Sequence, residues 1–213
     1  MEIRRREIAR YLGYKGTEPD AVISALIEEC VSELTACVRP RSVWEKYPLR
    51  LTFPNRVRIG QMDFESSGLT RNLKGCESVI LFAATLGTAA DTALRRASAR
   101  DMTRGVIMQA AAAEMIEAYC DEVQQDIREK AAVEGVFLRP RFSPGYGDCP
   151  LSLQKNITLM LNTPRQIGLT VTENDLLIPI KSVTAFIGIS RYDTHCIKHG
   201  CDTCEKTDCA FRL

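Results

Sequence analysis

The stretch from Arg141 to Pro150 reads RFSPGYGDCP, and it is the most informative segment of the chain. Its two prolines and two glycines fix an unusual backbone path that leaves amide groups accessible. The segment places the guanidinium of Arg141 near the aromatic ring of Tyr146 in the sequence. A guanidinium is able to bind a carboxylate through two hydrogen bonds. The segment is therefore a candidate loop for a ligand that carries a carboxylate. The alternative is a tight turn whose arginine is paired within the protein.

On both sides of this loop, helical and extended patterns intermingle without a regular strand–helix–strand cycle. This order favours an α+β class, with a mixed or antiparallel twisted sheet flanked by helices. We expect an N-terminal helical region at 1–40, an α+β domain at 41–190 and a cysteine-rich tail at 191–213. Helices are predicted over 3–13, 19–38, 66–73, 88–98, 102–129 and 151–161, and strands over 49–53, 57–59, 78–83, 169–172 and 182–190.

Composition and charge restrict the class of protein. Of the 213 residues 45% are hydrophobic and 26% charged, as in an ordinary globular chain, and 28 Lys and Arg balance 27 Asp and Glu. This balance argues against nucleic-acid binding, which needs a basic surface. The longest strongly apolar stretch, 79–84, is far shorter than the ~20 residues that span a bilayer. With no signal-peptide pattern after Met1, we expect a cytoplasmic chain without membrane contact.

Four of the nine cysteines lie together near the end of the sequence. Cys196, Cys201, Cys204 and Cys209 are separated by gaps of four, two and four residues, and both histidines of the chain fall in the same region. Four thiolates at this spacing are able to close one tetrahedral site around zinc or an iron–sulfur cluster. Redox-active or idle thiols are the alternative. The tail is therefore a candidate metal site with the metal left open.

The helix predicted over 102–129 carries the acidic residues Glu114, Glu117 and Asp121 away from its apolar stripe. A solvated face is the simplest interpretation of these acids. The chain has no dinucleotide-binding glycine motif, no P-loop and no zinc-protease motif, and no histidine lies outside the tail. Acid–base catalysis built on histidine is therefore not expected in the main body.

The pattern R-x-x-P-G-Y-x-x-C-P at 141–150, followed by a helix, LTVTE at 169–173 and P-x-x-S-V-T at 179–184, resembles the reactivation domain of cobalamin-dependent methionine synthase. The resemblance implies a fold like that activation domain and the binding of S-adenosylmethionine. The family's loop arginine, glycine and tyrosine, which contact S-adenosylmethionine, correspond to Arg141, Gly145 and Tyr146.

Two further residues of that family's site have counterparts here. The small residue two positions after the loop arginine corresponds to Ser143, where a backbone contact is implied. The acidic residue on the preceding helix corresponds best to Glu114, with Glu117 as the second choice.

In this family, cobalamin that has slipped to the inactive Co(II) state is rescued by one electron and a methyl group from S-adenosylmethionine. The resemblance thus implies a component of methionine synthase (methyltransferase) activity in methionine biosynthesis. The cobalamin-binding pattern D-x-H-x-x-G is matched only in part at 193–198, so we expect the cobalamin on a partner. That partner is a methionine synthase or another corrinoid protein, with flavodoxin or ferredoxin as the electron donor.

Two other functions fit the sequence. The first is a non-catalytic interaction module that binds S-adenosylmethionine and zinc. The second is an iron–sulfur redox relay that delivers electrons to a corrinoid protein without methylating it. The reductive chemistry of the family favours an iron–sulfur cluster over zinc in the tail.

Overall fold

The structure, a computed structural model, describes residues 1–14 and 16–193. Contacts within the chain define two units that alternate along the sequence. Unit 1 consists of residues 1–43, 83–125 and 162–183. Unit 2 consists of 44–82, 126–161 and, within the described chain, 184–193.

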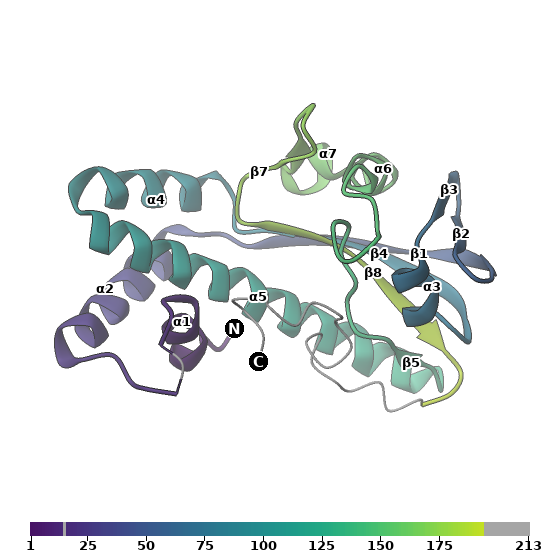
Figure 1. The fold of residues 1–213 in the computed structure, drawn as a ribbon, viewed down its shortest axis with the longest axis horizontal. Coiled ribbons are helices and arrows are strands. Elements are labelled where there is room, and N and C mark those ends of the chain that lie inside the picture. The colour runs from purple at the N-terminus through teal and green to yellow at the C-terminus, as the bar shows by residue number, and fades with distance from the viewer. Residues whose placement is uncertain (15, 194–213) are drawn as a thin grey trace. The chain divides into compact units, whose positions relative to one another are not determined.

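Unit 1 is mainly helical (Figure 1). An N-cap begins α2, because the Asp20 carboxylate accepts a hydrogen bond from the Ile23 N–H group at 2.9 Å. In the same way, Asp101 accepts from the Arg104 N–H group at 3.0 Å in the first turn of α5. α2 packs against α4. The helices are α1 (Arg5–Tyr11), α2 (Ala21–Cys37), α4 (Thr88–Arg100), α7 (Thr163–Ile167) and the part of α5 (Met102–Val133) up to residue 125.

A short antiparallel pair of strands, β6 (Thr170–Val171) and β7 (Leu177–Ile178), also belongs to unit 1. The strand predicted over 169–172 forms one side of this pair. β6 and β7 form a two-stranded sheet of their own, separate from the six-stranded sheet.

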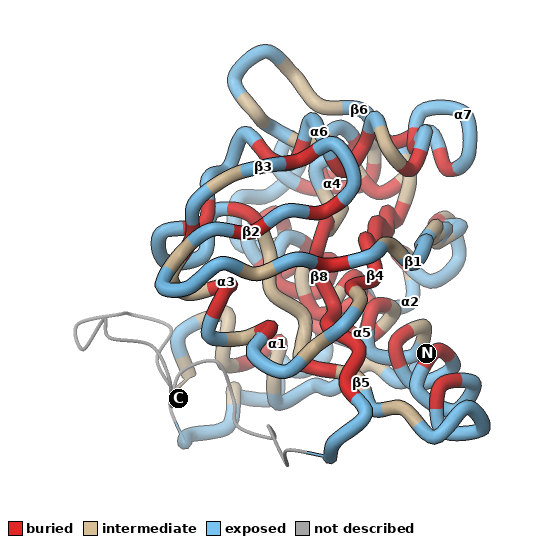
Figure 2. The backbone as a smooth tube through the Cα atoms, turned by 90° about the vertical axis from the view of Figure 1, so that its right-hand side faces the viewer, coloured by how far each residue is buried: buried red, intermediate tan, exposed pale blue. Residues whose placement is uncertain are grey.

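Unit 2 contains most of a six-stranded sheet with the order β3-β2-β1-β4-β8-β5. The pairs β1–β2, β2–β3 and β5–β8 are antiparallel. β4 from Val79 onward and β8 from Thr184 onward are buried, and Figure 2 shows both strands in the buried interior. The strands are β1 (Arg41–Thr52), β2 (Arg56–Ile59), β3 (Met62–Glu65), β4 (Cys76–Thr85), β5 (Phe137–Leu138) and β8 (Ser182–Ser190).

Unit 2 also contains two short helices, α3 (Ser67–Asn72) and α6 (Leu153–Met160), and the end of α5 from residue 126. The predicted α+β class, with an activation-domain-like sheet and helices, is confirmed. None of the helices in the described chain is long and apolar enough to cross a membrane.

Several elements differ from the sequence prediction. β1 begins at Arg41 instead of residue 49, and β3, β5, β7 and α7 were not predicted at all. In the first half of β1 the residues are exposed or half-buried, so this half lacks the alternation that marks a strand. α7 follows Asn162, which has a left-handed backbone conformation with a φ of 47°.

Candidate ligand-binding loop

The loop at 141–150 lies in unit 2 and starts beside β8. The N–H group of Arg139 donates to the Gly188 carbonyl oxygen at 2.8 Å. Phe142 and Phe186 then exchange two backbone hydrogen bonds, of 2.9 and 2.8 Å, in an isolated antiparallel bridge. The first arm of the loop is therefore fixed to the strand that forms part of the core.

The tip of the loop is closed by three backbone hydrogen bonds of its own. Tyr146 N–H donates to the Ser143 carbonyl oxygen at 3.2 Å, and Gly145 N–H and Cys149 N–H donate to the Cys149 and Tyr146 carbonyl oxygens, both at 2.9 Å. This path requires φ angles of +88° at Gly145 and +54° at Gly147, a region that glycine adopts without steric cost. The glycines predicted to shape the loop do so through these angles.

Side chains of the loop differ in exposure. Tyr146 is 63% exposed, and the centroid of its ring lies 6.1 Å from that of Phe142 at an angle of 59°. Arg141 and Ser143 are half-buried. Four predicted ligand-binding residues, Arg141, Ser143, Gly145 and Tyr146, thus lie on one short loop with a fixed backbone.

The end of the loop is attached to α3 by Asp148. The carboxylate accepts hydrogen bonds from the Ser66 hydroxyl at 2.8 Å, from Gly68 N–H at 3.0 Å and from Ser67 N–H. Burial alone would raise the pKa of Asp148, but these hydrogen bonds outweigh it and hold the pKa below its ordinary value. Asp148 is not among the site residues predicted from the sequence, although it lies within the motif.

Cys149, next to Asp148, is inert in its protonated form. It is 3% exposed, and burial raises the pKa of its thiol to about 12 despite a hydrogen bond with Ser66. Since the thiolate is the reactive form, Cys149 is not a nucleophile at neutral pH. Its side chain belongs to the buried apolar residues of the protein.

Glu114 lies in unit 1, in the middle of α5, and its side chain is fully buried. One carboxylate oxygen accepts hydrogen bonds from the Arg4 Nε–H and backbone N–H groups at 2.7 and 3.2 Å, and the other accepts from Arg4 Nη2 at 3.3 Å. The hydrogen bond with Glu114 outweighs burial and raises the pKa of Arg4. The interpretation of these acids as a solvated face is therefore wrong for Glu114, whereas Glu117 is half-buried.

Cys196, Cys201, Cys204 and Cys209, the predicted metal ligands, lie outside the described residues. Over residues 1–14 and 16–193, no group of three or more His, Cys, Asp or Glu side chains is placed to hold a metal ion.

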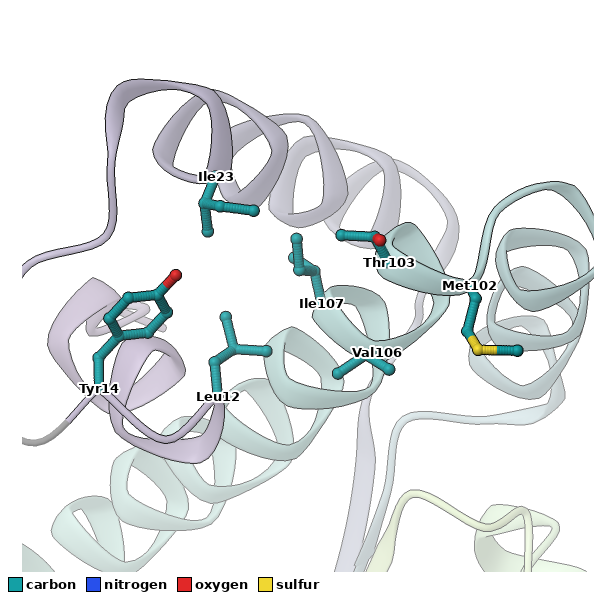
Figure 3. A pocket seen from close by; sticks show the side chains of 7 residues that line it. All are labelled: Leu12, Tyr14, Ile23, Met102, Thr103, Val106 and Ile107. Atoms are coloured by element: carbon teal, nitrogen blue, oxygen red, sulfur yellow. The ribbon is translucent and has the colours of Figure 1, made fainter.

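Unit 1 also contains an apolar pocket of about 350 Å³ (Figure 3). Side chains that follow α1 and side chains from the starts of α2 and α5 surround it, and none of them is charged. The predicted site residues are not among them. Its lining consists of Leu12, Tyr14, Ile23, Met102, Thr103, Val106 and Ile107.

Comparison with known proteins gives the family. Residues 69–195 match the family described as "Vitamin B12 dependent methionine synthase, activation domain". Among solved structures, the chain is similar to one entitled "Crystal Structure of the MetH Reactivation Domain bound to AdoHcy" with a TM-score of 0.63 and 17% identity. That similarity covers 87% of this chain and 73% of the other. No curated protein matches. Because the family match extends over more than half of the residues, the chain belongs to the activation-domain family of vitamin B12-dependent methionine synthases.

Proposed function

We propose that this protein binds S-adenosylmethionine through the loop at 141–150 and supports reductive methylation of cobalamin on a separate methionine synthase or corrinoid protein. The observation that carries the proposal is the loop itself, which combines Arg141 and Tyr146 with a closed and anchored backbone. The solved reactivation domain with bound AdoHcy supports it, because AdoHcy is S-adenosylmethionine without the transferred methyl group.

Each loop residue has a task that suits the chemistry of this ligand. Arg141 is suited to bind the carboxylate through two charge-assisted hydrogen bonds. The exposed ring of Tyr146 offers an apolar wall beside the ligand. Gly145 N–H already donates to Cys149, so the contribution of Gly145 is the absence of a side chain at a close approach. The contact at Ser143 is expected from its backbone.

The methyl transfer itself needs little from this chain. Cobalamin, when a partner brings it, supplies the reduced cobalt that takes the methyl group from the sulfonium. The residues of the loop hold S-adenosylmethionine, the methyl donor, in one orientation and keep water away from it. An electron donor such as flavodoxin or ferredoxin completes the reaction. No acid–base residue is required, which agrees with the lack of histidine before the tail.

Glu114 is proposed to bind the ammonium group of the ligand, with Glu117 as the second candidate. The buried pair of Glu114 with Arg4 constrains this assignment, because an ammonium would have to share or replace the Arg4 guanidinium. Titrations of Glu114→Gln and Glu117→Gln separate the two: the variant of the residue that binds the ammonium should lose affinity, and the other should keep it.

The cysteine tail is proposed as a separate metal unit, with an iron–sulfur cluster favoured over zinc because the reaction is reductive. Metal analysis of protein isolated without oxygen tests it. One zinc ion per chain supports a structural site, and iron with sulfide supports a cluster. Less than one metal ion per chain would refute both.

The central test is calorimetric titration with S-adenosylmethionine. Arg141→Ala should weaken binding about ten- to a hundredfold, because a charge-assisted contact contributes roughly 1.5–3 kcal/mol. Arg50→Ala is the matched control, since Arg50 is an exposed arginine on β1 of the same unit. Equal affinity of Arg141→Ala and the wild type would contradict the loop assignment. A redox relay without a ligand site would show no binding in any variant.

A further inference from the structure

The clearest feature that the proposed function leaves unused is the attachment of the loop to α3. The N–H groups in the first turn of α3 have no carbonyl partner within the helix, as in every helix. Its own N-cap, Ser66, accepts from Leu69 N–H at 3.1 Å and leaves the amides of Ser67 and Gly68 without a partner from within the helix. Asp148 accepts hydrogen bonds from both of these amides and from the Ser66 hydroxyl.

Gly68 shows how closely the loop and α3 approach each other. A Cβ atom at this position would lie 3.1 Å from Asp148 Oδ1 and 3.2 Å from Phe142 Cζ. These two atoms belong to opposite arms of the loop, so the absence of a side chain at Gly68 lets both arms rest on one turn of helix. Phe142 is also bonded to β8. The first arm therefore has two attachments, and the second arm depends on Asp148 for its hydrogen bonds to α3.

We propose that Asp148 is a positioning residue for ligand binding: its carboxylate, held by the first turn of α3, fixes the second arm of the loop and so the place of Tyr146 relative to Arg141, which the first arm holds. This role rests on the proposed function. Asp148 itself does not touch the ligand. It raises the fraction of molecules whose loop is ready to bind, and the observed affinity falls in proportion when that fraction falls.

Two substitutions of Asp148 should weaken ligand binding to different degrees. Asp148→Ala removes all three hydrogen bonds. If the loop then has its binding conformation in about one molecule in ten, S-adenosylmethionine should bind about tenfold more weakly. Asp148→Asn keeps an oxygen that accepts from Ser66 and Gly68 but turns an NH₂ group toward Ser67 N–H. We therefore expect a partial rescue, with binding about threefold weaker than in the wild type.

Asp20→Ala is the control, because it removes an aspartate that also accepts a hydrogen bond from an amide in the first turn of a helix, here α2. Hydrogen exchange without ligand supplies the second measurement. In Asp148→Ala the amides of Gly145, Tyr146 and Cys149, which close the loop, should exchange faster, while those of β8 keep their rates. Asp20→Ala should change neither the affinity nor these loop amides.

The results separate the possible failures. Wild-type affinity in Asp148→Ala would overturn this role alone, as would an equal loss of affinity in Asp20→Ala or faster exchange in β8 as well as in the loop. No binding by the wild-type protein would overturn the proposed function, and the positioning role with it. If Asp148→Ala does not fold, Asp148→Asn carries the test, and unchanged affinity and exchange in that variant would overturn the role.

Discussion

The loop at 141–150 and the middle of α5 both carry residues of the proposed site, and they hold them in opposite ways. In the loop the backbone is fixed by hydrogen bonds while the side chain of Tyr146 is 63% exposed. In α5 the side chain of Glu114 is itself fixed, since it is fully buried and paired with Arg4. Substitutions in the loop should therefore report on ligand binding, and substitutions at Glu114 should report first on stability.

The largest effect that tests this contrast is expected in Arg4→Ala. The substitution leaves a buried carboxylate at Glu114 without its cation, so the free energy of unfolding should fall by about 3 kcal/mol. Urea denaturation measures it, with Glu114→Gln and the double variant to complete a cycle. The double variant should lose much less than the sum of the two single losses. Additive losses would show that the two side chains stabilise the protein independently.

A smaller loss of stability is expected in the loop from Gly145→Ala. The φ angle of +88° is costly for alanine, and its Cβ would lie 3.1 Å from Leu151 Cδ1. Thermal unfolding should show a loss of about 1 to 2 kcal/mol, accompanied by weaker ligand binding. Gly147→Ala is the control, because at φ +54° a Cβ meets no atom within 4 Å. A larger loss at Gly147 than at Gly145 would contradict this account.

The smallest effect concerns pH. Asp148 has a pKa below its ordinary value of 3.8 in the folded protein, so folding favours its ionised form. Its contribution to stability is complete above that ordinary value and is lost as the pH falls through the lower folded pKa. The stability difference between the wild type and Asp148→Asn should therefore stay constant well above pH 3.8 and shrink as the pH falls below that value. A difference that also stays constant below pH 3.8 would show that the charge is not involved.

The sequence predicts those parts of the fold that have strong local patterns. The helices predicted over 88–98 and 102–129 correspond to α4 and α5, because their alanines and apolar residues recur at helical spacing. β3 was missed because only Met62 and Phe64 carry its alternation, over four residues. The predicted division into 1–40, 41–190 and 191–213 stays a prediction.

In the candidate site, too, the sequence predicts the residues that have a local pattern and does not predict their distant partners. The loop was found because its prolines, glycines, arginine and tyrosine are contiguous in the sequence. The partner of Glu114, Arg4, is 110 residues away, and the Ser66 hydroxyl that binds Asp148 is 82 residues away. No local pattern marks such pairs. They arise only when the fold brings distant segments together.

The alternation of the two units along the sequence has a consequence for synthesis of the chain. A protein emerges from the ribosome with its N-terminus first, and contiguous domains often fold in that order. Here the last segment of unit 1, at 162–183, follows two segments of unit 2. A nascent chain that ends before residue 162 therefore has neither unit complete, although it already contains the whole of α5 and the loop at 141–150. The loop is thus made before β8, the strand that holds its first arm, and can take its final form only after translation has passed residue 190.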